Sequence, residues 1–305
     1  MLKKQSLYVA AISIVLFVLC VLGSLWDYEI ATAVYIGQSP SENLFGIVFA
    51  FIGIAPTFVG WSFLGASILC ISRNGDIGKK KRGYFTALSV LLFVLSFFYF
   101  CNTLLMVNGD SLPVHWAVAY SVGIAIIFLA AIAGFKLTKG SKDTKLLAKI
   151  LFLTLVSLIT MIIIMSTKEI MNRPRFRWVL ETENHEYFLS WWQNGRQLKE
   201  ASGEALSDEF SSFPSGHSAY SMFAIFLFPT LADFIKGLEK YRGLLFASGF
   251  IWWALTALSR MTVGAHYLTD VAFAGAVTVF AYAAVKLVCH LITRRKHSLK
   301  ADSQP

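Results

Sequence analysis

Long apolar runs with almost no charge dominate this sequence and limit the folds open to it. Of its 305 residues, 56% are apolar and only 15% are charged, whereas soluble domains carry roughly 25% charged residues. A helix needs about 20 apolar residues to cross roughly 30 Å of hydrocarbon. The runs predict an all-α fold, a polytopic membrane helix bundle of about eight transmembrane helices. The expected spans are residues 6–26, 44–71, 84–107, 114–136, 148–166, 217–235, 243–262 and 268–292.

The connectors between these runs alternate in charge. The basic ones are residues 1–5, 72–83, 136–149, 236–242 and 293–300. Residues 26–43, in contrast, hold acids but no Lys or Arg. Because Lys-rich and Arg-rich loops stay in the cytoplasm, eight spans put both termini there and the long connector 168–213 on the other side. The net charge of +9 is thereby assigned to topology, and we expect no nucleic-acid partner.

The first apolar run, which follows Lys3 and Lys4, has two interpretations. It is either a signal peptide cleaved near Gly23 or an uncleaved anchor. Since its apolar stretch exceeds the about 7–15 residues of a signal-peptide core, we expect an anchor.

Three polar segments lie at ends of the predicted spans, and the expected topology puts all of them on one side. They are residues 168–176, 213–218 and 259–270. Ionisable groups at this depth are costly unless they pair or face water, so each segment is a candidate functional site. The connector 168–213 mixes charge with Trp and Tyr, a composition typical of the headgroup region. We expect it to be partly helical and interfacial. We interpret His185 within it as a solvated loop histidine, and the alternative is an additional site residue.

The third segment contains His266 and Asp270, four residues apart. On a helix they share a face, so the carboxylate can hold one imidazole nitrogen while the other acts as nucleophile or base. The alternative is a polar pair that only links helices. Arg260 favours the first interpretation, because a planar, bidentate donor suits an anionic substrate.

The second segment places Pro214, Ser215 and Gly216 at the start of a predicted span, followed by His217. Backbone amides at a helix start can approach an anion, and the anion would favour the imidazolium form of His217, which can protonate a leaving group. The plainer alternative is a Ser N-cap beside an interfacial His.

The first segment contributes Lys168 and Arg175, seven residues apart, with Pro174 making a continuous helix doubtful. Snorkelling of the two side chains to the interface is the alternative. The convergence of these cations with Arg260, two histidines and a helix start on one side of the membrane indicates a site for phosphoryl transfer.

At these residues the sequence resembles the type 2 phosphatidic acid phosphatase family, which shares its site with vanadium-dependent haloperoxidases. The family pattern K-x6-R-P, P-S-G-H and S-R-x5-H-x3-D is matched by Lys168 and Arg175, then by residues 214–217, then by Ser259, Arg260, His266 and Asp270. Phe176 replaces the usual Pro. The common six-helix members have three spans before the first motif, whereas five are expected here.

The resemblance implies a mechanism and a domain layout. His266 is the implied nucleophile, Asp270 orients it, and His217 is the general acid and base. The implied phosphate-binding residues are Lys168, Arg175, Ser215, Gly216 and Arg260. Residues 1–147 are then an accessory membrane region, 148–293 the catalytic core, and 294–305 a cytoplasmic tail. No cofactor and no metal are expected, since the cations can replace Mg²⁺ and no acidic cluster is present to bind it.

The expected substrate is a lipid phosphate, because the site opens at the edge of the bilayer. Phosphatidate, phosphatidylglycerophosphate and undecaprenyl diphosphate all fit, and we favour a bacterial inner membrane with the site outside the cytoplasm. Two alternatives use the same residues: a phosphoryl transferase with another acceptor, and a lipid transporter or binding protein. Transporters usually place charges near the midplane, whereas here they gather at one interface.

Overall fold

A computed structural model of the chain describes residues 2–39, 42–111, 116–203 and 208–301. Within these ranges the regular structure is helical, as predicted, and no strand occurs. The α-helices are α1 (Leu2–Val34), α2 (Leu44–Ile52), α3 (Ala55–Asn74), α4 (Lys79–Ser111), α5 (Trp116–Thr138), α6 (Thr144–Met171), α7 (Phe176–Glu181), α8 (Arg196–Ala201), α9 (Gly216–Met222), α10 (Ala224–Leu231), α11 (Arg242–Thr262) and α12 (Leu268–Ala301). Short 3-10 turns are η1 (His185–Tyr187), η2 (Asp208–Phe210) and η3 (Glu239–Tyr241).

Seven helical segments of the described chain are long and apolar enough to cross a membrane, so the protein is a polytopic membrane helix bundle. They are Ser6–Val34, Leu44–Asn74, Lys79–Thr103, Tyr120–Thr138, Thr144–Glu181, Glu239–Thr262 and Leu268–Arg295. Seven of the eight predicted spans fall on these segments. The first residues of the span predicted at 114–136 lie outside the described residues.

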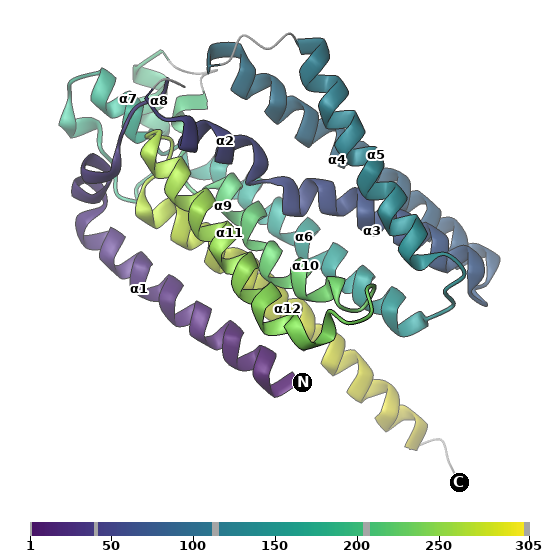
Figure 1. Ribbon diagram of the computed structural model, residues 1–305. Helices are drawn as coiled ribbons and strands as arrows, with labels where there is room; N and C mark the ends of the chain where they lie inside the picture. The colour runs from purple at the N-terminus through teal and green to yellow at the C-terminus, as the bar shows by residue number, and fades with distance from the viewer. Residues whose placement is uncertain (1, 40–41, 112–115, 204–207, 302–305) are drawn as a thin grey trace.

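The sixth predicted span, residues 217–235, differs from the prediction. It forms α9 and α10, of 7 and 8 residues, joined at Phe223. The two together rise about 24 Å, less than the roughly 30 Å of a bilayer core. They run end to end along α11 (Figure 1). The segment ends early because the Asp233 carboxylate, just beyond α10, pairs with Lys149 and accepts from Arg242 Nη2 at 2.5 Å.

The second predicted span is interrupted as well. α2 ends at Ile52 with Gly53 as its C-cap, and α3 begins at Ala55. The Gly53 carbonyl accepts from Trp252 Nε1 at 3.1 Å, and a Cβ on Gly53 would lie 2.4 Å from Thr256 Cγ2. The chain therefore bends where its backbone touches α11, a contact that only glycine permits.

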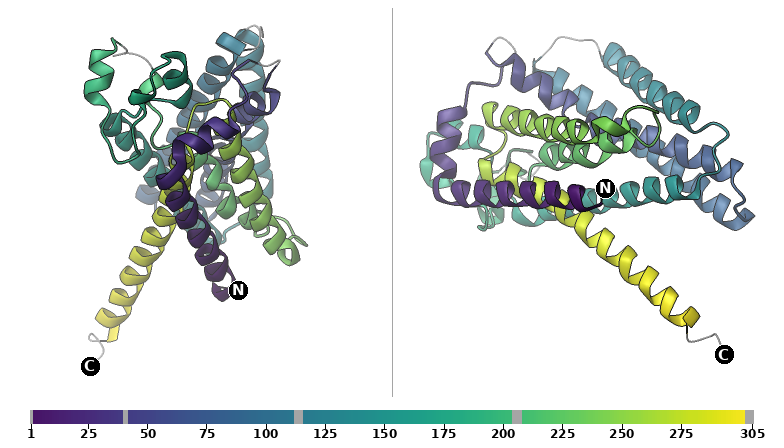
Figure 2. Two further views of the ribbon diagram at one scale, coloured as in Figure 1. Left: turned by 90° about the vertical axis from the view of Figure 1, so that its left-hand side faces the viewer. Right: turned by 60° about the horizontal axis from the view of Figure 1, so that its bottom comes forward.

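Helices α6, α9, α11 and α12 meet at the centre of the bundle. Helix α1 packs along α12 on one side, and α3 connects this centre to α4 and α5 on the other (Figure 1). The C-terminal part of α12 leaves the bundle (Figure 2). Residues 294–301 of the predicted tail thus continue a helix, and 302–305 lie outside the described residues.

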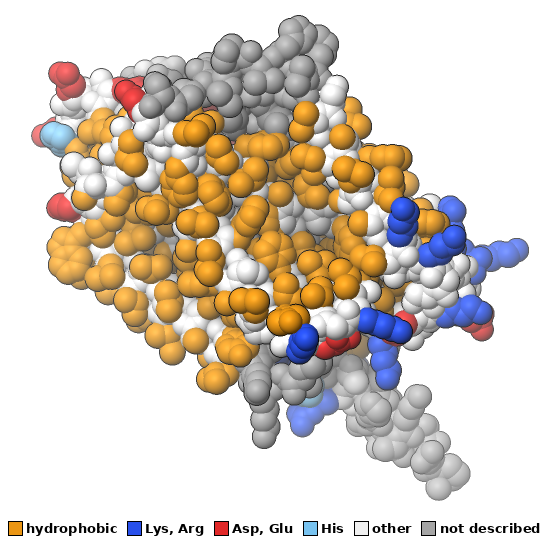
Figure 3. Space-filling view, viewed as in Figure 1, with side chains coloured by type: hydrophobic (Ala, Val, Ile, Leu, Met, Phe, Trp, Pro, Cys, Tyr) orange, Lys and Arg blue, Asp and Glu red, His pale blue; other side chains and the backbone are white. Residues whose placement is uncertain are grey.

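Charged side chains gather at opposite ends of an apolar surface. In Figure 3 hydrophobic side chains cover the middle of the molecule, basic side chains crowd the end with the α5–α6 turn, and acids lie at the end with α7 and α8. Both ends of the chain lie toward the basic end (Figure 1). This distribution agrees with an integral membrane protein. Which end faces the cytoplasm stays a prediction of the charge pattern.

Candidate active site

The first motif lies where α6 ends. Asn172 adopts a left-handed conformation with φ of 47°, its N–H bonds the Lys168 carbonyl, and Pro174 follows two residues later. These residues stop the helix, so Lys168 is on its last turn and Arg175 precedes α7. The Lys168 ammonium donates to the Ser211 carbonyl, which brings the first motif to the start of the second.

Arg175 is held by the 3-10 turn η2. Its backbone N–H donates to the Glu209 carbonyl at 2.7 Å and its Nε to the Asp208 carbonyl at 3.0 Å. Its Nη2 forms an ion pair with the Asp208 carboxylate. Partial desolvation tends to raise the pKa of the Asp208 carboxyl, but the charges of Arg175 and Lys168 outweigh it and lower that pKa below its usual value. The Arg175 guanidinium, which is predicted to bind phosphate, is thus ion-paired with the Asp208 carboxylate.

The second motif forms the start of α9. Ser215 is the N-cap, and its Oγ accepts from the Ser218 N–H at 3.3 Å. The Ser215 N–H donates to the Asp270 carbonyl at 3.1 Å, which joins the second motif to the third. A Cβ on Gly216 would lie 3.8 Å from Lys168 Cε, so the lysine stem runs beside the start of this helix.

The predicted nucleophile, His266, lies in the short turn between α11 and α12 and is buried. Its Nδ1 is 2.6 Å from the Ser212 carbonyl oxygen but 3.7 Å from Asp270 Oδ2. The carbonyl can only accept, so Nδ1 carries the proton and Nε2 keeps its lone pair. Asp270 is linked to His266 through Ser212, because Asp270 Oδ2 accepts from Ser212 Oγ at 2.5 Å. The spacing predicts a direct His266–Asp270 hydrogen bond. In the structure Ser212 lies between them, with its carbonyl bound to His266 and its hydroxyl bound to Asp270.

Burial lowers the pKa of His266 to about 3. The nearby negative charge of Asp270 opposes this shift, while the positive charges of Lys168 and Arg175 add to it. The imidazole is therefore neutral at physiological pH, as a nucleophile must be.

Arg260 and His217 complete the cluster. Arg260 lies in the last turn of α11, buried, and its Nε has no hydrogen-bond partner in the described chain. His217 Nε2 is likewise buried without a partner there. Arg260 lies within electrostatic range of Arg175, and His217 within range of Arg260 and His266. Unpartnered buried polar atoms are rare enough to need an explanation, and a polar ligand would supply one.

All eight predicted site residues are therefore brought to one end of the bundle by the ends of α6 and α11 and the starts of α9 and α12. His185 is not among them: it is exposed on η1, where its ring contacts the Tyr28 hydroxyl. Among the residues that the structure describes, no group of three or more His, Cys, Asp or Glu could hold a metal ion.

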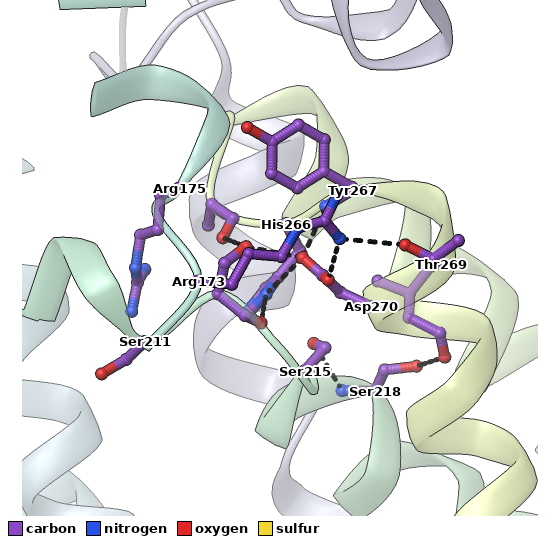
Figure 4. Close-up of polar contacts among 12 residues, drawn as sticks. Arg173, Arg175, Ser211, Ser215, Ser218, His266, Tyr267, Thr269 and Asp270 are labelled. Carbon is purple, nitrogen blue, oxygen red and sulfur yellow. Dashed lines mark hydrogen bonds and ion pairs between the residues drawn. The ribbon is translucent and has the colours of Figure 1, made fainter. Parts of the chain in front are cut away.

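Three residues in contact with this cluster were not predicted. Arg173 donates to Asp270 (Figure 4), Asp27 pairs with Arg173, and Ser212 contacts both His266 and Asp270. The sequence did carry a signal for Asp27, an acid at the end of an apolar run, where an unpaired charge is costly. Nothing in its spacing pointed to Arg173.

The comparisons with known proteins agree with the motifs. No curated protein and no solved structure matches the chain. Residues 146–296, which hold all three motifs, match the family model of the PAP2 superfamily, while residues 1–145 lie outside the match. The C-terminal half of this chain is thus a PAP2 superfamily region, which confirms the predicted resemblance to the type 2 phosphatidic acid phosphatase family.

Proposed function

We propose that the protein is an integral membrane phosphatase that hydrolyses phosphate monoester or diphosphate groups of lipids. The observation that carries this proposal is the neutral, buried His266, whose Nδ1 is tied to the Ser212 carbonyl. Its Nε2 lone pair lies in a cluster with Lys168 and Arg175, whose charges act on the ring. A neutral nucleophile beside fixed cations is what phosphoryl transfer to histidine requires.

In the first step His266 Nε2 attacks phosphorus and forms a P–N bond as the P–O bond to the lipid breaks. Burial and the charge of Arg260 lower the pKa of His217 well below its usual value, so His217 takes up its proton when the anionic phosphate binds and then gives it to the departing oxygen. In the second step water attacks phosphorus, His217 takes a proton from that water, and the P–N bond breaks to release phosphate and neutral His266. Each half-reaction balances its protons through His217, which serves as acid and then as base.

The phosphoryl oxygens need positive partners in both steps. Lys168, Arg175 and Arg260 supply three charges, and Ser215 and the Gly216 amide contribute at the start of α9. Charge neutralisation and positioning are the main needs of phosphoryl transfer. We therefore propose that catalysis proceeds without a metal ion.

A lipid is the substrate class that this location favours. The site lies at the end of a bundle whose flanks are apolar (Figure 3), so an amphiphile can place its headgroup there while its chains stay in the bilayer. We propose undecaprenyl diphosphate or a related lipid phosphate, such as phosphatidate or phosphatidylglycerophosphate. The proposed setting is a bacterial inner membrane with the site outside the cytoplasm.

The test is release of inorganic phosphate from phosphatidate and from undecaprenyl diphosphate by purified protein in detergent with EDTA. His266→Ala should lower the rate about 10³-fold or more, while His185→Ala, which removes an exposed histidine of the connector, should leave it within about twofold. Equal rates for the unaltered chain and His266→Ala would refute the histidine mechanism. Loss of activity on adding EDTA would refute metal independence.

A further inference from the structure

Arg173 is a fully buried cation between two carboxylates. Its Nη1 donates to Asp270 Oδ1 at 2.6 Å and to Thr269 Oγ1 at 2.9 Å, and its Nη2 donates to Asp27 Oδ2 at 2.9 Å (Figure 4 shows the first two). Its Nε donates to the Leu189 carbonyl at 2.8 Å. The side chains of Arg173 and Asp270 are 0% exposed and that of Asp27 is 5% exposed. Charges buried this deeply persist only when they are paired and hydrogen-bonded.

The Asp27 carboxylate reaches this network from α1, a helix outside the catalytic half. α1 has a non-helical residue at Trp26, and Asp27 follows this kink. Asp27 Oδ1 accepts from the Thr269 N–H at 3.0 Å, and its Oδ2 also accepts from the Thr269 hydroxyl. Asp27 therefore holds both Arg173 and the first turn of α12, the helix that carries Asp270.

The same network reaches the imidazole of His266 by two routes. Through its side chain, Arg173 holds Asp270, whose Oδ2 binds the Ser212 hydroxyl at 2.5 Å and the Tyr267 N–H at 2.9 Å. Through its backbone, the Arg173 carbonyl accepts from the Ser212 N–H at 3.0 Å. Ser212 then holds Nδ1 of His266. Ser212, which orients His266, is thus held at its backbone by the Arg173 carbonyl and at its side chain by Asp270, which Arg173 binds.

We propose that Asp27 and Arg173 are positioning residues for His266, so that α1, expected to be accessory, contributes a side chain on which the rate of the chemical step depends. This inference rests on the proposed function. Neither residue touches the predicted phosphate-binding side chains in the contacts of the described chain. Their removal should therefore slow the attack on phosphorus without weakening phosphate binding.

The most direct variant is Asp27→Asn. Its amide oxygen can still accept from the Thr269 backbone, but an amide NH₂ would then face the Arg173 guanidinium, donor against donor. We expect kcat to fall about 10- to 100-fold, because small displacements of a reacting group cost that much. KM and the Ki of inorganic phosphate should stay within about threefold. Arg173→Lys, which keeps the charge but not the planar fork, should show the same pattern.

Two further variants separate positioning from general damage. Asp27→Glu restores the carboxylate and should recover part of the kcat lost in Asp27→Asn. Glu29→Gln removes a negative charge from an exposed position of the same helix and should match the unaltered chain.

The possible outcomes distinguish failure of the positioning role from failure of the proposed function. If the unaltered chain shows His266-dependent release and Asp27→Asn keeps kcat within twofold, the positioning role is refuted. It is refuted as well if the Ki of phosphate rises as much as kcat falls, or if Asp27→Glu recovers nothing. Absence of His266-dependent release in the unaltered chain would instead refute the proposed function, and this inference with it.

Discussion

The Asp208 carboxylate is ion-paired with Arg175, a predicted phosphate-binding residue. This contact predicts that substitution of Asp208 strengthens inhibition by the product, inorganic phosphate. Asp208 is ion-paired with Arg175 and lies within electrostatic range of Lys168 and His266. Its lowered pKa keeps the carboxylate ionised at the pH of an assay. A phosphate that binds Arg175 must displace this carboxylate, so Asp208→Asn should make phosphate bind more tightly.

The size of the effect follows from the exposure of the pair. The Asp208 side chain is 70% exposed, and exposed ion pairs are worth up to about 1 kcal/mol because water and ions screen them. Since 1.36 kcal/mol corresponds to about tenfold, the Ki of inorganic phosphate should fall about two- to fivefold. The backbone contact from Arg175 Nε to the Asp208 carbonyl is unaffected, so the guanidinium stays in place.

The assay is inhibition of lipid phosphate hydrolysis by added inorganic phosphate, at low salt and at about 1 M salt. The difference between Asp208→Asn and the unaltered chain should shrink at high salt, where the Debye length is about 3 Å. Glu186→Gln removes an exposed acid of the same connector and is the matched control. An unchanged or higher Ki in Asp208→Asn, or an equal decrease in Glu186→Gln, would refute the reasoning.

Two further predictions concern stability. Because native His266 stays neutral down to about pH 3 while an unfolded histidine takes up a proton near pH 6.5, the free energy of unfolding should rise with pH between these values. Unfolding temperatures in detergent at several pH values should show this rise, and His266→Gln should flatten it; an unchanged slope would contradict the neutral native state. Gly249→Ala should lower the unfolding temperature, because its Cβ would lie 2.7 Å from the backbone C and O of Ala224 where α11 crosses α10, an overlap that costs about 1–3 kcal/mol. The control is Gly243→Ala, whose Cβ would lie 3.5 Å from the Tyr8 hydroxyl, and equal melting of the two variants would show that the helices separate easily.

Those parts of the site could be predicted whose residues lie close together in the sequence. His266 and Asp270 are four residues apart, and residues 214–217 are contiguous, so local helical geometry already limits where their side chains go. The alternating charge of the connectors indicated that these residues share one side of the membrane. The structure brings them together where α9 and α12 begin.

Contacts between segments that are far apart in the sequence could not be predicted from the spacing of residues. Asp27 and Arg173 are 146 positions apart, and their pairing depends on how α1 packs against α12. The acceptor of His266 is a backbone carbonyl, that of Ser212, and backbone acceptors exist at every residue. Similarly, hydropathy cannot tell that residues 217–235 form two short helices that are joined at Phe223 and end before Asp233, whose carboxylate pairs with Lys149 and Arg242.

The pairing of Asp27 with Arg173 also sets an order of events during biosynthesis. Ribosomes add about 5–20 residues per second, so Asp27 is made about 7–30 s before Arg173. Throughout this interval the carboxyl of the first helix has no arginine partner, and burying it as an anion would be costly. We therefore expect Asp27 to stay in contact with water or to be protonated until α6 has been made. Helix α1 is then fixed in its final position by a residue that is made after it, in the second half of the chain.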